Sequence, residues 1–246
     1  MADSIGRPRV FLANVGVNAQ HRLVSPLRDD GSFTLVTIPE QVDGPGMVHY
    51  GDVSALRAVV PERYWHQPTH YDPEFESFTY GDNCGWAPRA AALKACRPCD
   101  YIFFIARLIG SAGPVFALVG CLRLEGILRD VQAKPGKPAL RRFGANAHVR
   151  RAIVETRYWD GFWVFAGGPG SQLFPRAVVV GRAEAELLFR DRTGATWIWR
   201  DGRTDLQTIG SYTRSCRCVI DPQLDPARAA EWWALLRERV GFAQWQ

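Results

Sequence analysis

The chain has 246 residues, the size of one large domain or two small ones. Its composition is 47% hydrophobic and includes 9 Trp, 13 Phe and 7 Tyr, which predicts a sizeable core and excludes a disordered or collagen-like protein. No apolar run reaches the roughly 18 residues that span a bilayer, and the first residues lack the pattern of a signal peptide. We therefore expect a soluble, cytoplasmic protein without a membrane partner.

The net charge of +5 is unevenly distributed along the chain. Residues 1–82 carry 6 Arg and 11 acidic residues, so the remainder carries a net charge of +10, and much of it lies in residues 122–158. Positive charge concentrated in this way indicates a polyanionic partner such as DNA or a nucleotide. The alternative is a solvated, arginine-rich surface, because only 3 of the 30 basic residues are Lys.

Segments rich in β-branched and aromatic residues, bounded by Gly, Pro or polar residues, predict strands. They are residues 9–14, 33–38, 101–108, 115–128, 152–158, 162–165, 178–180, 186–189 and 196–199. Residues 101–108 and 115–128 are joined by a Gly- and Pro-containing connection, which predicts a β-hairpin. We expect a curved, mostly antiparallel sheet or a partly open barrel.

Helices are expected at three places. Short helical segments are predicted near residues 53–60 and over 89–96. Asp225 is an N-cap residue with Pro226 at the first helical position, and apolar residues along one face predict an amphipathic C-terminal helix at about 226–241. Residues 41–90 are otherwise irregular in pattern. The whole chain, 1–246, is predicted to be one α+β domain.

The six cysteines raise the question of a metal. Cys96 and Cys99 have a spacing found in zinc and redox motifs, but Cys216 and Cys218 are too close together to complete a zinc site. The Cys96–Cys99 motif also leads into a strand, whereas redox motifs open a helix. In a chain without a secretory signal, free thiols are expected. The sequence therefore predicts no metal site.

Polar residues follow the first predicted strand directly. Asn14, Asn18, His21 and Ser25 can supply several hydrogen-bond donors and acceptors at a strand end, where ligand sites commonly lie. The alternative is a polar turn whose asparagine side chains bind their own backbone.

A second polar group lies in the irregular region. His70 and Asp72 could be a base held by a carboxylate, or two of three metal ligands. Tyr80 and Asp82 could hydrogen-bond a base or a sugar. A purely structural role is the alternative for all four residues.

Two further motifs suit an anion. Asn146 and His148, placed on a predicted strand, are flanked by two pairs of arginines that could bind phosphate: Arg141, Arg142, Arg150 and Arg151. The glycine-rich segment before Ser171, followed by Arg176, exposes backbone N–H groups that can also bind an anion. It lacks the Lys-Ser/Thr pair of a P-loop, and Leu173 excludes a nucleophile elbow. Exposed loops and tight turns are the alternatives.

Taken in order, these motifs resemble a known family. They are Asn14-Val-Gly-x-Asn18, His21, Ser25-Pro26, Asp30-Gly31-x-Phe33, Ile38-Pro39-Glu40, Asp72, Phe78-Thr-Tyr-Gly-Asp82, Asp100-Tyr-Ile-Phe-Phe104, Val119-Gly120 and Asn146-x-His148. The order is similar to that of a nucleotide-modification-associated domain, the third of that series, over residues 9–182. Such domains are found in bacteria, archaea and phages beside genes for DNA-base hypermodification.

The resemblance implies a role in DNA base modification, with partner enzymes of a modification system, and adds Glu40 to the ligand-binding residues. It also places Cys99 where a glycine is usual before Asp100, so Cys99 is expected to occupy a turn. The strand at 101–108 and its hairpin partner are similar in pattern to PUA-like and EVE-like barrels that read modified bases, which is an analogy only.

Three functional classes follow. A nucleic-acid or nucleotide-binding module would use an arginine-lined groove, amides or carboxylates at the base edge, and an aromatic wall. Candidates for that wall are Tyr64, Trp65, Tyr80, Trp86, Tyr158 and Trp163. A transferase or hydrolase acting on a base or nucleotide would use a histidine as base and a carboxylate to orient it. The third class is a structural partner in a modification or defence complex.

In the enzyme alternative, the base would be His21, His70 or His148, and the orienting carboxylate Glu40, Asp72 or Asp82. Ser25 and Ser171 would contact an anion. No motif specifies a cofactor. We expect one pocket, rimmed by the four arginines, to be lined by Asn18, His21, Asp82, Asn146 and His148.

Overall fold

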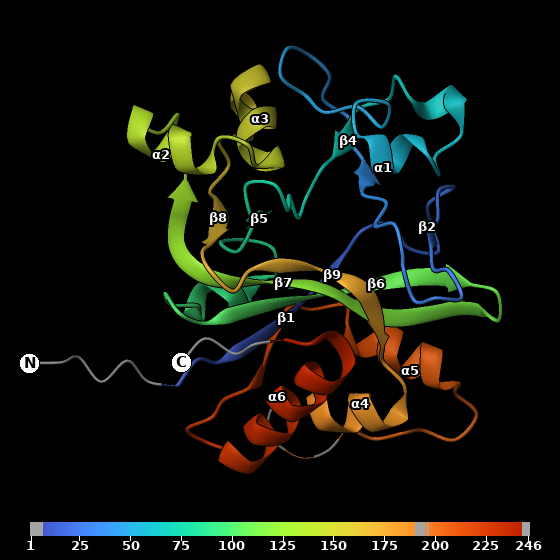
Figure 1. Ribbon diagram of the computed structural model, residues 1–246. Helices are drawn as coiled ribbons and strands as arrows, with labels where there is room; N and C mark the ends of the chain where they lie inside the picture. Colours follow the sequence, from blue (N-terminus) through green and yellow to red (C-terminus); the bar gives the residue numbers. More distant parts are fainter. Residues whose placement is uncertain (1–6, 190–194, 196, 243–246) are drawn as a thin grey trace, which may run out of the picture.

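The computed structural model describes residues 7–189, 195 and 197–242. A large, mostly antiparallel sheet forms its centre, with helices on both sides, which confirms the α+β fold class (Figure 1). The strand order is β10-β1-β6-β7-β8-β5, with β2 beside β6 and β9 beside β7, so the sheet is open. The strands are β1 (Val10–Val15), β2 (Ser25–Pro26), β5 (Thr79–Asp82), β6 (Tyr101–Gly110), β7 (Gly113–Val131), β8 (Phe162–Gly167), β9 (Gln172–Val179) and β10 (Arg217–Ile220).

The predicted hairpin is confirmed and gives the sheet its curvature. β6 and β7 pair from Tyr101 opposite Arg123 to the turn at Ser111. Beyond Leu124, the 19-residue β7 leaves β6 and pairs with β8, with irregularities in register on the way. Such irregularities bend a strand, and in Figure 1 β7 curves away from the sheet toward α2 (Lys137–Phe143).

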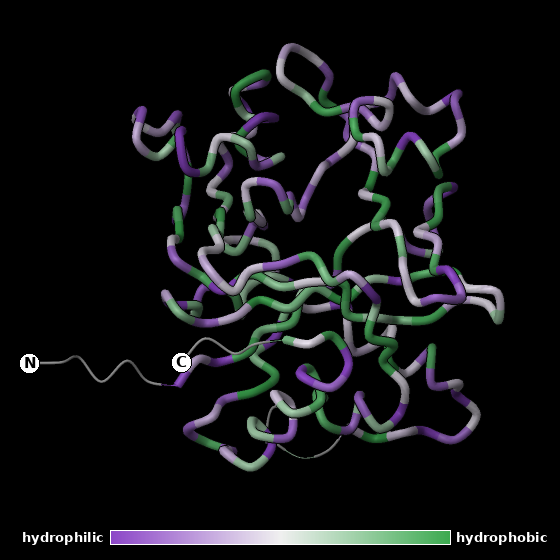
Figure 2. Tube along the Cα trace, in the orientation of Figure 1, coloured by the Kyte–Doolittle hydropathy of each residue, from purple (hydrophilic) through white to green (hydrophobic). Residues whose placement is uncertain are grey.

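Both faces of the central strands are buried, which explains their continuous apolar runs. Alternate residues of β6 enter two different clusters, with Tyr101 and Phe103 on one face and Ile102 and Phe104 on the other. Figure 2 shows hydrophobic residues concentrated along these strands. Three helices cover the first face: α4 (Arg182–Leu188), α5 (Asp205–Tyr212) and α6 (Pro226–Val240).

Short elements cover the other face (Figure 1). They are β3 (Ile38–Pro39) paired with β4 (Thr69–His70), α1 (Ser54–Arg57), α2, α3 (Ala147–Val154), and the 3-10 turns η1 (Glu62–Tyr64), η2 (Ala91–Ala95) and η3 (Thr156–Tyr158). The predicted C-terminal helix is confirmed as α6, where the Asp225 carboxylate accepts the backbone N–H of Arg228. No helix of the described residues is long and apolar enough to span a membrane.

Several predicted strands are wrong. Residues 152–154 and 186–188 are helical, because Asn146 caps α3 and Glu184 accepts the N–H of Gly181 at the start of α4; residues 156–158 form the 3-10 turn η3. Within 33–38 only the last residue belongs to a strand, since the Val36 N–H binds the Ser25 hydroxyl. Of 196–199, Thr196 lies outside the described residues and 197–199 form no regular element.

Candidate functional site

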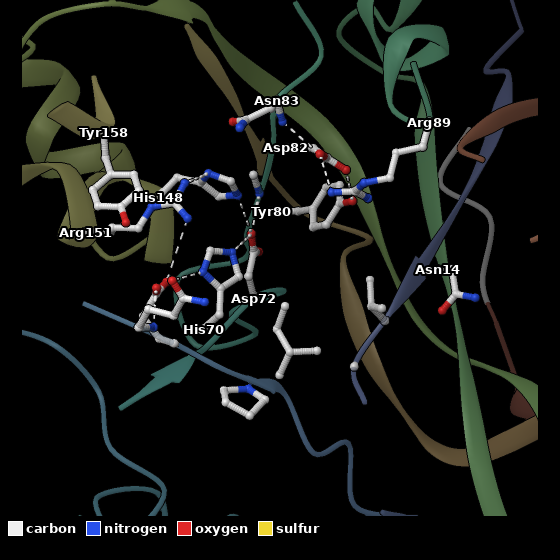
Figure 3. A pocket seen from close by; sticks show the side chains of 17 residues that line it. Asn14, His70, Asp72, Tyr80, Asp82, Asn83, Arg89, His148, Arg151 and Tyr158 are labelled. Carbon is white, nitrogen blue, oxygen red and sulfur yellow. Dashed lines mark hydrogen bonds and ion pairs between the residues drawn. The ribbon is translucent and has the colours of Figure 1, made fainter. Parts of the chain in front are cut away.

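A polar pocket of about 420 Å³ lies between the end of β1, the β3–β4 pair, β5 and α3 (Figure 3). Its volume falls within the range of about 300–1,000 Å³ that small-molecule sites occupy. Its lining residues extend from Asn14 to Tyr158, which are 144 positions apart in the chain (158 − 14). Eight predicted site residues line it: Asn14, Glu40, His70, Asp72, Tyr80, Asp82, His148 and Arg151.

The structure places Asn18, His21 and Ser25 away from this pocket. Asn18 donates its N–H to His21 Nδ1 and accepts the Gln20 N–H at 2.9 Å, the local turn given above as the alternative. The Ser25 hydroxyl is buried and accepts the Val36 N–H at 3.0 Å. These three side chains organise the chain after β1.

The glycine-rich segment is a tight turn between β8 and β9. The Ser171 hydroxyl accepts the backbone N–H of Arg123 at 3.0 Å, which fixes the turn to β7. Arg176 is an exposed residue of β9 beside Gly31. Neither residue lines the pocket of Figure 3.

Among the four predicted phosphate-binding arginines, only Arg151 lines the pocket. Arg142 donates to the carbonyls of Ser77 and Gly167, and Arg150 donates to those of Ala145 and Gly46. Arg141 is exposed on α2. Arg142 and Arg150 therefore link α2 and α3 to neighbouring segments by hydrogen bonds to backbone carbonyls.

The start of α3 carries the Asn146-Ala-His148 motif into the site. Asn146 is the N-cap of the helix; its Oδ1 accepts the His148 N–H at 3.0 Å and its Nδ2 donates to Asp72 Oδ1 at 3.3 Å. A Cβ on Gly81 would come within 2.5 Å of His148 and 2.7 Å of Asn146. Only glycine allows β5 to approach these two side chains so closely.

Asp72 is buried at the pocket floor. The backbone N–H of Gly81 donates to its Oδ2 at 2.8 Å. Burial raises the pKa of Asp72 well above its usual value, and the neighbouring charges of Asp82 and Glu74 act in the same direction.

Glu40, which is buried, and His70, which is partly buried, form a pair. Glu40 Oε2 lies 2.8 Å from His70 Nδ1, and its other oxygen accepts the N–H of Gln41 at 2.7 Å. Burial raises the pKa of Glu40, but the hydrogen bond and charge of His70 and the charge of Arg151 outweigh it and lower the pKa to about 2. The ionised carboxylate only accepts, so Nδ1 carries a proton. His70 Nε2 lies 3.9 Å from Asp72 Oδ2.

His148 faces the same carboxylate beside His70, and the centroids of the two imidazole rings are 4.7 Å apart. Its Nε2 lies 3.8 Å from Asp72 Oδ2, while Arg151 donates to its Nδ1 at 3.1 Å. Burial lowers the pKa of His148 well below its usual value, and the charges of His70 and Arg151 lower it further. The ring is therefore neutral. The Arg151 guanidinium also lies over the ring of Tyr158, 4.5 Å from its centroid.

A second polar cluster forms the opposite wall. Asp82 accepts hydrogen bonds from the Tyr80 hydroxyl at 2.9 Å and from Arg89 at 2.8 Å. Asn83 Oδ1 and Arg151 Nε are buried and have no hydrogen-bond partner among the described residues. A buried polar atom without a partner is costly, so these two atoms favour a polar ligand in the pocket.

Sequence reasoning missed Asn83 and Arg89. Arg89 looked like the first residue of a helix, although η2 begins only at Ala91. Asn83 directly follows β5, and its position at a strand end was the signal available.

Of the six candidate wall aromatics, Tyr80 and Tyr158 line the pocket. Trp86 is 63% exposed and donates to the Asp160 carbonyl, and Trp163 is buried in the core. Tyr64 and Trp65 pack against a separate apolar cluster.

Three side chains of the pocket floor are grouped closely enough to share one cation. His70, Asp72 and His148 each offer one ligand atom, and these atoms all lie within 4.8 Å of one another.

Comparison with curated proteins and with solved structures gave no match. The family model described as "Nucleotide modification associated domain 3" matches residues 9–229, nearly all of the chain. This span contains every residue of the pocket. The chain therefore belongs to the nucleotide modification associated domain 3 family.

Proposed function

We propose that the pocket binds a nucleotide unit of DNA and that the protein serves a DNA base-modification system. The observation that carries this proposal is that charged, aromatic and hydrogen-bonding side chains line one pocket. The family of the chain is associated with nucleotide modification. Arg89 and Arg151 supply positive charge, Tyr158 supplies a ring face, and Asp82 and Asn83 supply acceptors for a base edge.

A neighbouring groove supports a strand rather than a free nucleotide. The groove has a volume of about 940 Å³ and shares Asn14 with the pocket. Arg107, Arg203 and Arg214 line it, and none of them forms an ion pair with a described residue. Guanidiniums without an ion-pair partner among the described residues, beside the proposed nucleotide pocket, suit the phosphates of adjoining nucleotides.

Chemistry on the bound nucleotide is the second candidate function. The specific observation is the Glu40–His70 pair: Glu40 accepts the Nδ1 proton of His70, and His70 Nε2 lies 3.9 Å from Asp72 Oδ2 at the pocket floor. Clusters of buried ionisable groups in a pocket are typical of active sites. Recognition alone, or a structural role in a modification complex, does not require such a cluster.

The test is binding of a fluorescein-labelled single strand of about 20 nucleotides, measured by anisotropy from about 50 to 200 mM salt. We expect a steep loss of affinity with salt, and a further loss of about 10–100-fold in Arg151→Ala, because a charge-assisted contact is removed. Arg237→Ala is the control, since Arg237 is exposed on α6, on the other side of the sheet.

Equal affinity in the wild type and Arg151→Ala would contradict the assignment of the pocket. No measurable binding to any strand or deoxynucleoside monophosphate would favour the structural role. Incubation of a bound strand, followed by mass spectrometry of its nucleosides, separates recognition from catalysis.

A further inference from the structure

We propose that His70, Asp72 and His148 hold a divalent first-row transition-metal ion at the floor of the pocket. The ion would lie in the pocket described above. Only the role of the ion, and not its binding, rests on the proposed function. The sequence left two interpretations of His70 and Asp72: a base held by a carboxylate, or two of three metal ligands. The inference favours the second interpretation, and His148 supplies the third ligand. It also differs from the expectation drawn from the cysteines, which took no account of histidines far apart in the chain.

The donor set determines the class of ion. Two imidazole nitrogens and one carboxylate oxygen suit ions such as Zn²⁺, Mn²⁺ or Fe²⁺, whereas Mg²⁺ and Ca²⁺ prefer ligands that are all oxygen. Asp72 Oδ2 lies 3.9 Å from His70 Nε2 and 3.8 Å from His148 Nε2. Tetrahedral bonds of about 2.0–2.2 Å hold ligand atoms about 3.3–3.6 Å apart, so the two Asp72–histidine distances must shorten by a few tenths of an ångström. The three donor atoms lie within 4.8 Å of one another, so the two imidazoles must approach each other by roughly 1 Å.

Neighbouring groups already orient two of the three ligands. Glu40 accepts the Nδ1 proton of His70, which leaves Nε2 free to bind a cation. The Gly81 N–H and the Asn146 amide donate to Asp72. A carboxylate behind a ligating histidine, and hydrogen bonds to a ligating carboxylate, are the usual outer partners of metal ligands.

His148 must change its hydrogen bonding to become a ligand. Its bond from Arg151 to Nδ1 requires the ring proton at Nε2, where a cation would bind. Binding therefore moves the proton to Nδ1 and turns Arg151 away, toward Glu40, whose carboxylate is 3.9 Å from the guanidinium. Arg151 consequently opposes metal binding, and its removal strengthens it.

Another histidine of the chain provides a matched control. His49 lies on the surface between Asp43 and Asp52, at 2.9 and 3.2 Å, so each of its ring nitrogens already faces a carboxylate. This cluster has one imidazole and exposed carboxylates, and His49→Gln should leave metal binding unchanged.

The experiment uses the full chain, freed of metal by chelation and titrated with Zn²⁺ by calorimetry and with Co²⁺ by visible absorption. We expect one ion per chain in the wild type and in His49→Gln. Asp72→Asn should weaken binding by at least about 100-fold, and Glu40→Gln by about 10–100-fold, the usual effect of removing an outer partner. Circular dichroism and the melting temperature show whether each variant is folded.

Arg151→Met keeps the inference testable if the ligand variants fail to fold, because Arg151 is not a ligand. It should bind Co²⁺ at least as tightly as the wild type while it loses the labelled strand. A wild-type protein that binds no stoichiometric ion would overturn the inference, as would Asp72→Asn binding like the wild type. Metal binding without strand binding leaves the inference standing and contradicts the proposed function alone, and the reverse result contradicts the inference alone.

Discussion

The two sides of the sheet bury different kinds of side chain. On the side of α4, α5 and α6, the buried cluster consists of apolar residues and includes Trp232 and Trp233 packed on Phe103 and Tyr101. The other side, in or beside the pocket, contains five buried acidic or histidine residues: Glu40, Asp72, Glu74, Asp82 and His148. Burying charge costs free energy that apolar packing does not. The contrast indicates that the apolar side supplies most of the stability, while the candidate pocket lies on the other side.

The largest effect on stability is expected from Trp232→Ala. Trp232 is fully buried and its ring centroid lies 5.2 Å from that of Phe103. Its loss should lower the free energy of unfolding by about 3–5 kcal/mol, measured by urea denaturation. Strand affinity at a temperature where the variant stays folded should not change. Leu224→Ala, at an 85% exposed position, is the control, and a loss of affinity with stability retained in Trp232→Ala would break the comparison.

Gly81→Ala should damage the other side. The new methyl group would lie 2.5 Å from His148 Cδ2, so α3 or β5 must move. We expect a stability loss of about 1–3 kcal/mol and a loss of strand and Co²⁺ binding. Gly85→Ala is the matched control, because a Cβ there meets only the Gly161 carbonyl at 3.6 Å. Normal binding by a folded Gly81→Ala would show that the approach of β5 to His148 is not needed.

Adjacent arginines offer a finer test. Arg150→Ala removes two bonds to backbone carbonyls and should lower the free energy of unfolding by about 1–2 kcal/mol. It should leave strand affinity unchanged. Arg151→Ala should weaken strand binding and leave the free energy of unfolding unchanged. Equal effects of both substitutions on anisotropy would indicate a general electrostatic attraction instead of a defined pocket.

The smallest effect is expected at Cys99, which lies outside the pocket. Its φ is 76°, a conformation that favours glycine, as the expected turn before Asp100 implies. Cys99→Gly should raise the free energy of unfolding by about 1 kcal/mol, seen as a melting temperature a few degrees higher. Strand affinity should be unaffected. A lower melting temperature would show that the partly buried thiol contributes more than the backbone strain costs.

The elements that were predicted correctly have local signals. The β6–β7 hairpin has long apolar runs around a Gly- and Pro-containing turn, and α6 has a cap and a proline at its start. α3 looked like a strand because its end, Ala152-Ile-Val154, is rich in β-branched residues, and its actual determinant is the single cap Asn146.

The pocket depends on contacts that no local pattern encodes. Chemical type alone selected His70, Asp72 and His148, but their convergence requires β5 to pass close to α3, which Gly81 allows. Asn18 and His21 have the same chemical types as Asn146 and His148, but they form a local turn in which the Asn18 N–H donates to His21 Nδ1. Arg89 comes to Asp82 through a turn whose course the sequence does not specify.

The side-chain amide of Asn146 couples the thermal stability of the pocket to that of the first turn of α3. Asn146 gives its oxygen to the backbone of His148 and its nitrogen to Asp72. Helix ends fray at temperatures below global melting. Fraying of α3 would release Asp72 and His148 together, so strand binding should disappear on warming before the side of the sheet covered by α4, α5 and α6 unfolds. The protein would then inactivate reversibly while most of its circular dichroism signal persists.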